Sequence, residues 1–265
     1  MKACIYHQNQ ICEPHLWSGF SLNRGLFFGE SPFTSLKLVD GSYQGVDLHF
    51  RRLDKSLEFL FGVNLSDYRE EVEEGLNKLH ENSGEYYFRI TFTKTLNGEI
   101  DFFIYKMPYV NQEDELVLEK SNVIRGKTNL PNFLKVGNFL EYTLELKERT
   151  DFNEFVYYNF ENHLLECGTS NIFLLKDGVV YTPALIPGIL DGVTRSLLLQ
   201  FLREENIPVK ETTLLESDVL DSSEVWLTNS VKGVRSIKKY SGKEYLNETW
   251  AKLQEKFKNF VSEYE

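Results

Sequence analysis

The sequence contains few of the features that mark secreted, metal-bound or nucleic-acid-binding proteins. Its 265 residues include three cysteines, an odd number without a CxxC spacing, so neither a disulfide framework nor a cysteine zinc site is expected. It has no run of lysine or arginine, and its 40 acidic and 29 basic residues give a net charge of -11. Nucleic acid binding needs a basic surface and is therefore not expected. No segment reads as a secretory signal or is apolar for long enough to span a bilayer, so we expect a cytoplasmic protein that does not bind membranes.

What the sequence does contain is typical of a globular protein with substantial cores. Apolar residues make up 42% of the chain and aromatic residues 14%, and there are only 7 prolines and no low-complexity tract. A chain of this length can bury one large core or two modest ones, and we expect two.

The first half of the chain mixes helical and strand patterns. "SPFTSLKLVDGSY" predicts a strand followed by a turn at Asp40-Gly41, and "DLHFRRLDKSLEFLFG" predicts a helix that ends at Gly62. Ser66 is predicted to cap the next helix. "YYFRITFTK" and "EIDFFIYKMP" flank Asn97-Gly98, a strong hairpin signal.

The second half begins after a polar, irregular segment at about residues 111–130. A helix is predicted from about Asn138. Residues 161–183, which include Glu166, predict one strand, a hairpin turn at Asp177-Gly178 and a second strand. A helix over about 193–205, strands at 224–229 and 234–240, and a final helix from about Asn247 are predicted to follow. We therefore expect an α+β fold of two domains. A smaller N-terminal α/β domain would cover residues 1–115, a connection 116–130, and a larger C-terminal α/β domain 131–265, with catalytic groups in a cleft between the two domains.

Four segments carry residues that are candidates for binding or catalysis. Glu166 lies in an apolar strand region, where a carboxylate is costly unless a positive group meets it. In "PGILDGVTR", Gly188 and Gly192 precede a helix with Thr194 in its first turn, which favours either an anion site or simple capping. Arg52 in "HFRRL" is either a bidentate phosphate ligand or a solvated helix residue. Lys135 follows Phe133 and Leu134, and a lysine in apolar surroundings can form a covalent bond with a carbonyl group.

In order along the chain, these segments resemble the fold-type IV (class IV) pyridoxal-phosphate (PLP) enzymes. This family contains branched-chain aminotransferases, D-amino-acid aminotransferases and aminodeoxychorismate lyases, and the resemblance implies a two-domain fold like that of the D-amino-acid aminotransferases, with a pseudobarrel C-terminal domain. "LLECGTSNIFLLKDGVVYTP" is the most specific match. The resemblance implies PLP as cofactor, a homodimer and no metal site. It also implies a role for each matching residue: Lys135 for the covalent link, Glu166 for the pyridine nitrogen, and Arg52, the backbone amides of Val193 and Thr194 and the Ser230 hydroxyl for the phosphate. Because a buried ion pair needs both members, we expect Glu166 to be tolerable only with the cofactor in place.

The motifs next to these segments indicate which member of the family the chain resembles. Phe33-Thr34-Ser35 resembles the lyases, whereas aminotransferases usually read "GDGVFE" near the start. Lys94 stands in "TKT" where many relatives have "TRG", so we expect Lys94 to recognise a substrate carboxylate together with Thr34 and Arg125. Lys127 is a further candidate, and the alternative for Arg125 and Lys127 is a solvated linker.

Three functions remain open at this stage. The first is a lyase that converts 4-amino-4-deoxychorismate to 4-aminobenzoate and pyruvate, in folate biosynthesis. The second is an aminotransferase for D- or branched-chain amino acids, which would use the same lysine and cofactor. The third is a non-catalytic or metal-binding protein on the same fold, supported only by five scattered histidines: His7, His15, His49, His80 and His163.

Overall fold

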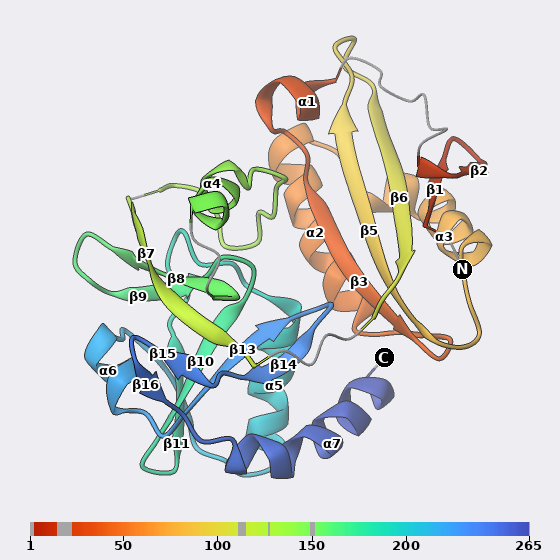
Figure 1. Cartoon of the computed structure of the whole chain (residues 1–265). Helices are drawn as coiled ribbons and strands as arrows, with labels where there is room; N and C mark the ends of the chain where they lie inside the picture. The colour runs from red at the N-terminus through yellow and green to blue at the C-terminus, as the bar shows by residue number, and fades with distance from the viewer. Residues whose placement is uncertain (1–2, 15–22, 111–114, 127, 149–151, 265) are drawn as a thin grey trace. The chain divides into compact units, whose positions relative to one another are not determined.

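The computed structural model describes residues 3–14, 23–110, 115–126, 128–148 and 152–264 (Figure 1). The chain divides into two compact units, and both combine helices and strands, so the predicted α+β class is confirmed. Unit 1 comprises Met1–Asn111, Phe133–Asn138 and Tyr264–Glu265, and unit 2 comprises Gln112–Asn132 and Phe139–Glu263. The segment Phe133–Asn138, which the sequence boundaries assign to the second domain, therefore belongs with unit 1.

Unit 1 is built on a six-stranded antiparallel sheet with the strand order β2-β1-β6-β5-β3-β4. Its strands are β1 (Cys4–His7), β2 (Gln10–Cys12), β3 (Phe33–Val39), β4 (Ser42–Tyr43), β5 (Glu85–Lys94) and β6 (Ile100–Pro108). Its helices are α1 (Arg24–Phe28), α2 (Val46–Phe61), the 3-10 helix η2 (Leu65–Tyr68) and α3 (Arg69–Lys78).

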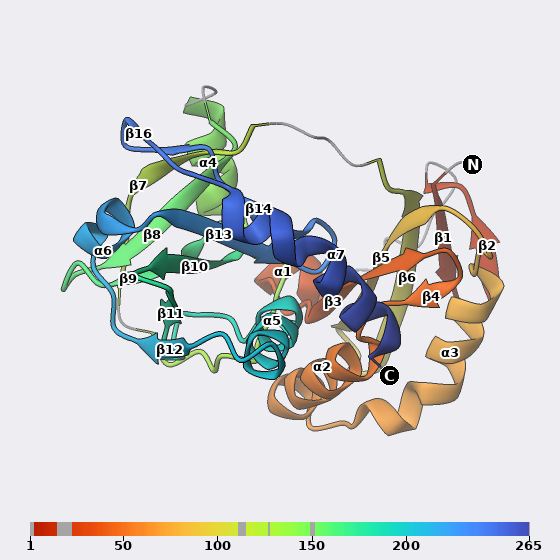
Figure 2. The ribbon, with the colours of Figure 1, turned by 90° about the horizontal axis from the view of Figure 1, so that it is seen from below.

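Helices α2 and α3 cover one face of this sheet (Figure 2). Alternate residues of β5, such as Phe88 and Ile90, face the helices and meet Leu53 and Leu57 of α2, all fully buried or nearly so. Helix α2 ends as predicted, at Gly62, whose φ of 70° closes the helix in the left-handed region. The hairpin turns predicted at Asp40-Gly41 and Asn97-Gly98 are also confirmed.

The predicted helix cap at Ser66 is wrong. Ser66 lies inside η2, which begins after Asn64 and precedes α3. The Asn64 N–H donates to the Asp67 carboxylate at 3.2 Å, so a polar residue two positions earlier starts the turn.

Unit 2 contains two five-stranded sheets, with orders β12-β11-β10-β13-β14 and β16-β15-β7-β8-β9. The strands are β7 (Val117–Arg125), β8 (Glu154–Asn159), β9 (Leu164–Cys167), β10 (Asn171–Lys176), β11 (Val179–Pro183), β12 (Val209–Thr212), β13 (Glu224–Asn229), β14 (Gly233–Ser236), β15 (Lys239–Tyr240) and β16 (Lys243–Glu244). The helices are α4 (Leu140–Glu148), α5 (Val193–Glu204), α6 (Glu216–Asp221) and α7 (Glu248–Glu263).

Both sheets of unit 2 contribute to one hydrophobic core. Leu118 of β7 and Val156 of β8 share it with Ile172 of β10 and Leu227 of β13, all fully buried or nearly so. Outside this core, α7 packs on α5 through Phe257 and Phe201, whose ring centroids lie 5.3 Å apart. The core thus fixes the strand ends from which the polar residues of unit 2 project.

Two strand predictions in unit 2 need correction. Glu166 does not share a strand with the Asp177-Gly178 hairpin, because β9 ends at Cys167 and pairs with β8, while β10 and β11 form the hairpin. The strand predicted at 234–240 is divided into β14 and β15, which join different sheets.

Among the described residues, no helix combines the length and the apolar character needed to cross a membrane.

Candidate active site

Unit 1 brings three of the predicted site residues together: Thr34, Arg52 and Lys135. Thr34 is on β3 and Arg52 on α2, and the Arg52 Nη2 donates to Thr34 Oγ1 at 3.1 Å. Lys135 lies in the segment Phe133–Asn138, whose carbonyl at Lys135 accepts the Phe33 N–H at 2.9 Å. Its Nζ lies 4.9 Å from the centre of the Phe33 ring. The predicted lysine and the predicted phosphate arginine therefore flank the same two residues of β3.

His49 joins this cluster, although the sequence assigned it no role. Its Nδ1 lies 2.7 Å from Thr34 Oγ1, and only 1% of the residue is exposed. Burial, followed by the positive charges of Arg52 and Lys135, holds the pKa of His49 well below its ordinary 6.5. The ring is therefore neutral near pH 7. Thr34 is completely buried, with its hydroxyl bonded on both sides.

Arg89 is a second residue of unit 1 that sequence reasoning missed. Its guanidinium carbon lies 3.6 Å from the centre of the Phe33 ring, so Arg89 and Lys135 both contact that ring. Burial lowers the pKa of Arg89, and its Nε donates to Thr91 at 3.1 Å. The alternation of β5 contained the signal, because Arg89 occupies the face opposite the apolar Phe88 and Ile90.

Lys94 lies apart from this cluster, at the end of β5. It is four positions beyond Ile90, the partner of Thr34 across the sheet. The hydrogen bond from Arg24, and more weakly the charge of Lys94, lower the pKa of Glu30. A substrate carboxylate at Lys94 stays a prediction.

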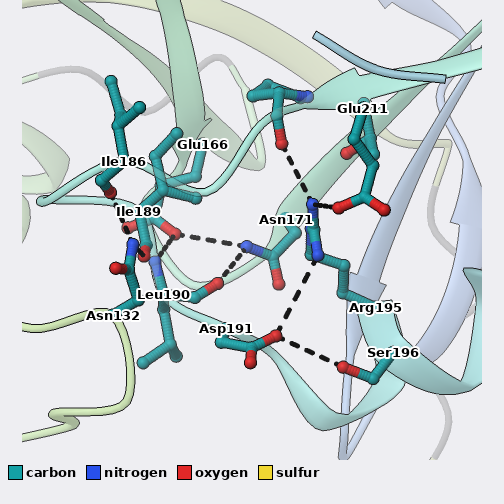
Figure 3. A network of polar contacts seen from close by, with 12 residues as sticks. Asn132, Glu166, Asn171, Ile186, Ile189, Leu190, Asp191, Arg195, Ser196 and Glu211 are labelled. Carbon is teal, nitrogen blue, oxygen red and sulfur yellow. Dashed lines mark hydrogen bonds and ion pairs between the residues drawn. The ribbon is translucent and has the colours of Figure 1, made fainter.

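In unit 2, Glu166 accepts hydrogen bonds from three donors among the described residues (Figure 3 shows two of them). Its Oε1 accepts from Arg125 Nη1 at 2.9 Å, and its Oε2 accepts from the Leu190 N–H at 2.9 Å and from Asn171 Nδ2 at 3.3 Å. The side chain is only 13% exposed. Our expectation that Glu166 is tolerable only with a cofactor in place is therefore wrong, because Arg125 already supplies a positive partner.

Arg125 itself is fixed at the end of β7. Its guanidinium carbon lies 4.0 Å from the centre of the Tyr157 ring, while one nitrogen bonds Glu166. Binding of a substrate carboxylate by Arg125 stays a prediction. Its guanidinium already binds one carboxylate, that of Glu166. Lys127 lies outside the described residues, as does His15.

The start of α5 has the features expected of the predicted anion site, and phosphate binding there stays a prediction. Gly192 precedes the helix and makes no side-chain cap, so the first N–H groups, including those of Val193 and Thr194, have no acceptor within the helix. A Cβ at Gly192 would lie 2.1 Å from Asn171 Oδ1, so glycine is required by this close approach. Thr194 Oγ1 donates to Ser230 Oγ at 3.3 Å, which brings the predicted phosphate hydroxyl of Ser230 to the first turn of α5.

Within the described residues, no group of three or more His, Cys, Asp or Glu side chains is placed to hold a metal ion. His163 contacts Glu161 at 3.3 Å, and His7 contacts Asp101 at 2.9 Å.

Comparison with known proteins identifies the family. Residues 31–240 match the family model for class IV aminotransferases, which is most of the chain. The chain belongs to the class IV aminotransferase family. The predicted family is thus confirmed, as is its character as an enzyme family.

Individual relatives carry different names. The chain is 27% identical over 221 residues to the "Probable branched-chain-amino-acid aminotransferase" of Thermotoga maritima, covering 80% of each chain. It is 35% identical over 112 residues to the aminodeoxychorismate lyase of Vibrio harveyi, covering 42% of this chain and 41% of the relative. An aminotransferase from Brucella abortus, solved with PLP bound, has the same fold, with a TM-score of 0.86, 20% identity and 99% of each chain covered.

Proposed function

We propose that the protein is a PLP-dependent 4-amino-4-deoxychorismate lyase, which forms 4-aminobenzoate and pyruvate. Membership of the class IV family supports the cofactor, and the Brucella abortus aminotransferase of the same fold is bound to PLP. The residues proposed to hold PLP are Lys135 for the covalent link, Glu166 for the pyridine nitrogen, and Arg52, Val193, Thr194 and Ser230 for the phosphate.

The donors and acceptors of the chain fit these roles. Three donors surround Glu166 and favour its ionised form, as an acceptor for a protonated pyridine nitrogen requires. The first turn of α5 offers backbone N–H groups and a helix dipole to a phosphate. One nitrogen of Arg52 donates to Thr34 Oγ1, and this hydrogen bond fixes the orientation of the planar guanidinium group.

When bound, PLP supplies an electron-withdrawing ring that stabilises negative charge on the amine-bearing carbon of the substrate. Lys135 Nζ then removes the proton from that carbon. This step needs the neutral amine of Lys135, whose Nζ lies 4.9 Å from the centre of the Phe33 ring. Glu166 keeps the pyridine nitrogen protonated through the same step. Loss of the enolpyruvyl group as pyruvate leaves an aromatic ring, which drives the reaction forward.

The observation that carries the lyase assignment is the Phe33-Thr34-Ser35 run together with the place of Thr34. The run resembles that of the lyases, and Thr34 lies between Arg52 and His49, at the centre of the unit 1 cluster. The 35% identity to the Vibrio harveyi lyase supports the same assignment. The longer match to the Thermotoga maritima protein favours the second candidate, an aminotransferase for branched-chain or D-amino acids.

The two functions differ in whether a second substrate is needed. A lyase regenerates its cofactor in every cycle, whereas an aminotransferase stops after one half-reaction until a keto acid arrives. We expect sustained formation of 4-aminobenzoate from aminodeoxychorismate alone, over many turnovers. Absence of product would contradict the lyase assignment, if D-alanine or leucine bleaches the cofactor absorbance and 2-oxoglutarate restores it.

The remaining proposals follow from the family. We expect a cytoplasmic homodimer that acts in folate biosynthesis on a small amino substrate, with Thr34, Lys94 and Arg125 near the substrate carboxylates. Light scattering would test the assembly, and a fully active monomer would contradict it.

A further inference from the structure

Arg235 of β14 carries buried donors that lack a hydrogen-bond partner. It lies opposite Leu227 of β13, a core residue, so its side chain starts on the core face of the sheet. The side chain is 24% exposed, yet its Nε and Nη2 atoms are buried and donate no hydrogen bond to any described residue. A buried donor without an acceptor costs free energy, so we expect these two Arg235 atoms to donate to a bound ligand.

The nearest carboxylate, Glu154 of β8, does not satisfy Arg235. Its Oε2 lies 3.9 Å from Arg235 Nη2, too far for a hydrogen bond. Glu154 instead accepts from the Thr169 N–H at 2.6 Å, from Thr169 Oγ1 at 3.0 Å and from Ser170 Oγ at 3.1 Å. The Glu154 carboxylate therefore stabilises the turn after β9, and it accepts no hydrogen bond from the Arg235 guanidinium.

A second cation, Lys232, lies on the turn that joins β13 to β14. Asn229 Oδ1 accepts the N–H groups of Val231 at 2.9 Å and Lys232 at 3.2 Å, which fixes the turn. Lys232 is an exposed residue, and the pKa of its amine is lowered by partial burial and then by the charge of Arg235. With Glu154, the three charges sum to +1.

This cation pair lies in the same part of unit 2 as the proposed cofactor residues. Ser230, a proposed phosphate ligand, is on the same turn as Lys232. Burial and the charges of Glu154 and Glu166 raise the pKa of Cys167, while the charges of Arg125 and Arg235 oppose that rise. Glu166 and Arg235 are therefore both near the Cys167 thiol.

We propose that Arg235 and Lys232 bind a carboxylate group of the amino substrate. The proposal rests on the proposed function for the identity of that substrate. A net charge of +1 matches one carboxylate, whereas Glu154 at 3.9 Å disfavours a dianionic phosphate. The planar fork of Arg235 suits a carboxylate, and Lys232 adds a point charge.

The test uses binding to the full-length protein carrying PLP and needs no turnover. Calorimetric titration with benzoate, an unreactive carboxylate, should give a Kd that rises about tenfold or more in Arg235→Gln, since charge-assisted hydrogen bonds are lost. Lys232→Gln, at an exposed position, should also raise the Kd for benzoate, and this variant provides the test if Arg235→Gln folds poorly. The matched controls Arg203→Gln and Lys239→Gln, both exposed, should leave the Kd unchanged.

A parallel titration with inorganic phosphate distinguishes a carboxylate site from a phosphate site. Phosphate binding should be the same in the wild type and in Arg235→Gln, and loss of phosphate or PLP binding in that variant would overturn the proposal. So would an unchanged benzoate Kd in both variants, or no benzoate binding to the wild type. In turnover, Arg235→Gln should raise KM about tenfold or more and change kcat little. If Lys135 holds no cofactor but benzoate binding still depends on Arg235, the proposed function fails and the carboxylate site stands.

Discussion

At the scale of single residues, the charge state of Glu166 is the feature on which the proposed chemistry depends most. Arg125, Asn171 and the Leu190 N–H hold a carboxylate at this position with or without a ligand. The carboxylate is therefore already held in place for its proposed contact with the protonated pyridine nitrogen. This view replaces the expectation that a ligand alone compensates the buried charge.

Glu166→Gln tests this role of Glu166. The amide is nearly isosteric but neutral, so it cannot keep the pyridine nitrogen protonated. We expect a folded protein by circular dichroism and a kcat lower by about 100-fold or more. Glu161→Gln, at an exposed position five residues earlier, is the control and should keep full activity. A Glu166→Gln variant with most of its activity would show that Glu166 does not bind the ring nitrogen.

His49 predicts a pH dependence of stability. Burial and the charges of Arg52 and Lys135 depress the pKa of His49 in the folded protein below the 6.5 of the unfolded chain. The unfolded state then binds more protons below pH 6.5, so this residue lowers stability as the pH falls, by about 1.4 kcal/mol per pH unit. The free energy of unfolding, measured by denaturant at pH 7.5 and 5.5, should fall less in His49→Gln than in the wild type. Equal decreases in the two proteins would contradict a buried neutral His49.

At the scale of helices and strands, short sequence motifs predicted helix ends and hairpin turns, whose conformation depends on a few neighbouring residues. Gly62 ends α2, and Asp177-Gly178 joins β10 to β11, because each motif fixes the left-handed conformation that its turn needs. Long-range pairing was not predictable in this way. The sequence offered Arg125 and Glu166 as separate candidates, since the contact between them depends on how β7, β8 and β9 pair.

The sequence did not indicate those site residues whose importance depends on the groups around them in the folded protein. Arg89 and Arg235 are ordinary arginines in the sequence, and only the ring of Phe33 or the missing acceptor distinguishes them. Likewise, nothing local indicates that the segment carrying Lys135 packs with unit 1. The family motifs found the residues proposed to hold the cofactor, whereas tertiary structure is needed for the groups around them.

The start of α5 provides a prediction at this scale. In Gly192→Ala, the new Cβ would lie 2.1 Å from Asn171 Oδ1 and would displace a residue that also bonds Glu166. We expect a stability loss of about 1–3 kcal/mol in thermal or denaturant unfolding. PLP binding should weaken about tenfold or more, because hydrogen bonds to a charged phosphate are disturbed. Gly126→Ala is the control, since its Cβ would meet only Phe160 at 3.4 Å. Equal effects of both substitutions would contradict the special role of Gly192.

At the scale of the whole molecule, the central proposal is that the chain binds PLP through a covalent link to Lys135. Arg52, Glu166 and the start of α5 are proposed to hold the same cofactor. Family membership supports this proposal.

Reduction of the purified protein with borohydride, followed by mass spectrometry of its peptides, tests this claim most directly. We expect a yellow protein whose colour is lost on reduction, and a pyridoxyl group fixed on the peptide that contains Lys135. The Lys135→Gln variant, treated in the same way, should carry no label. An unlabelled Lys135 peptide in the wild type, or a label on a different lysine, would contradict the account.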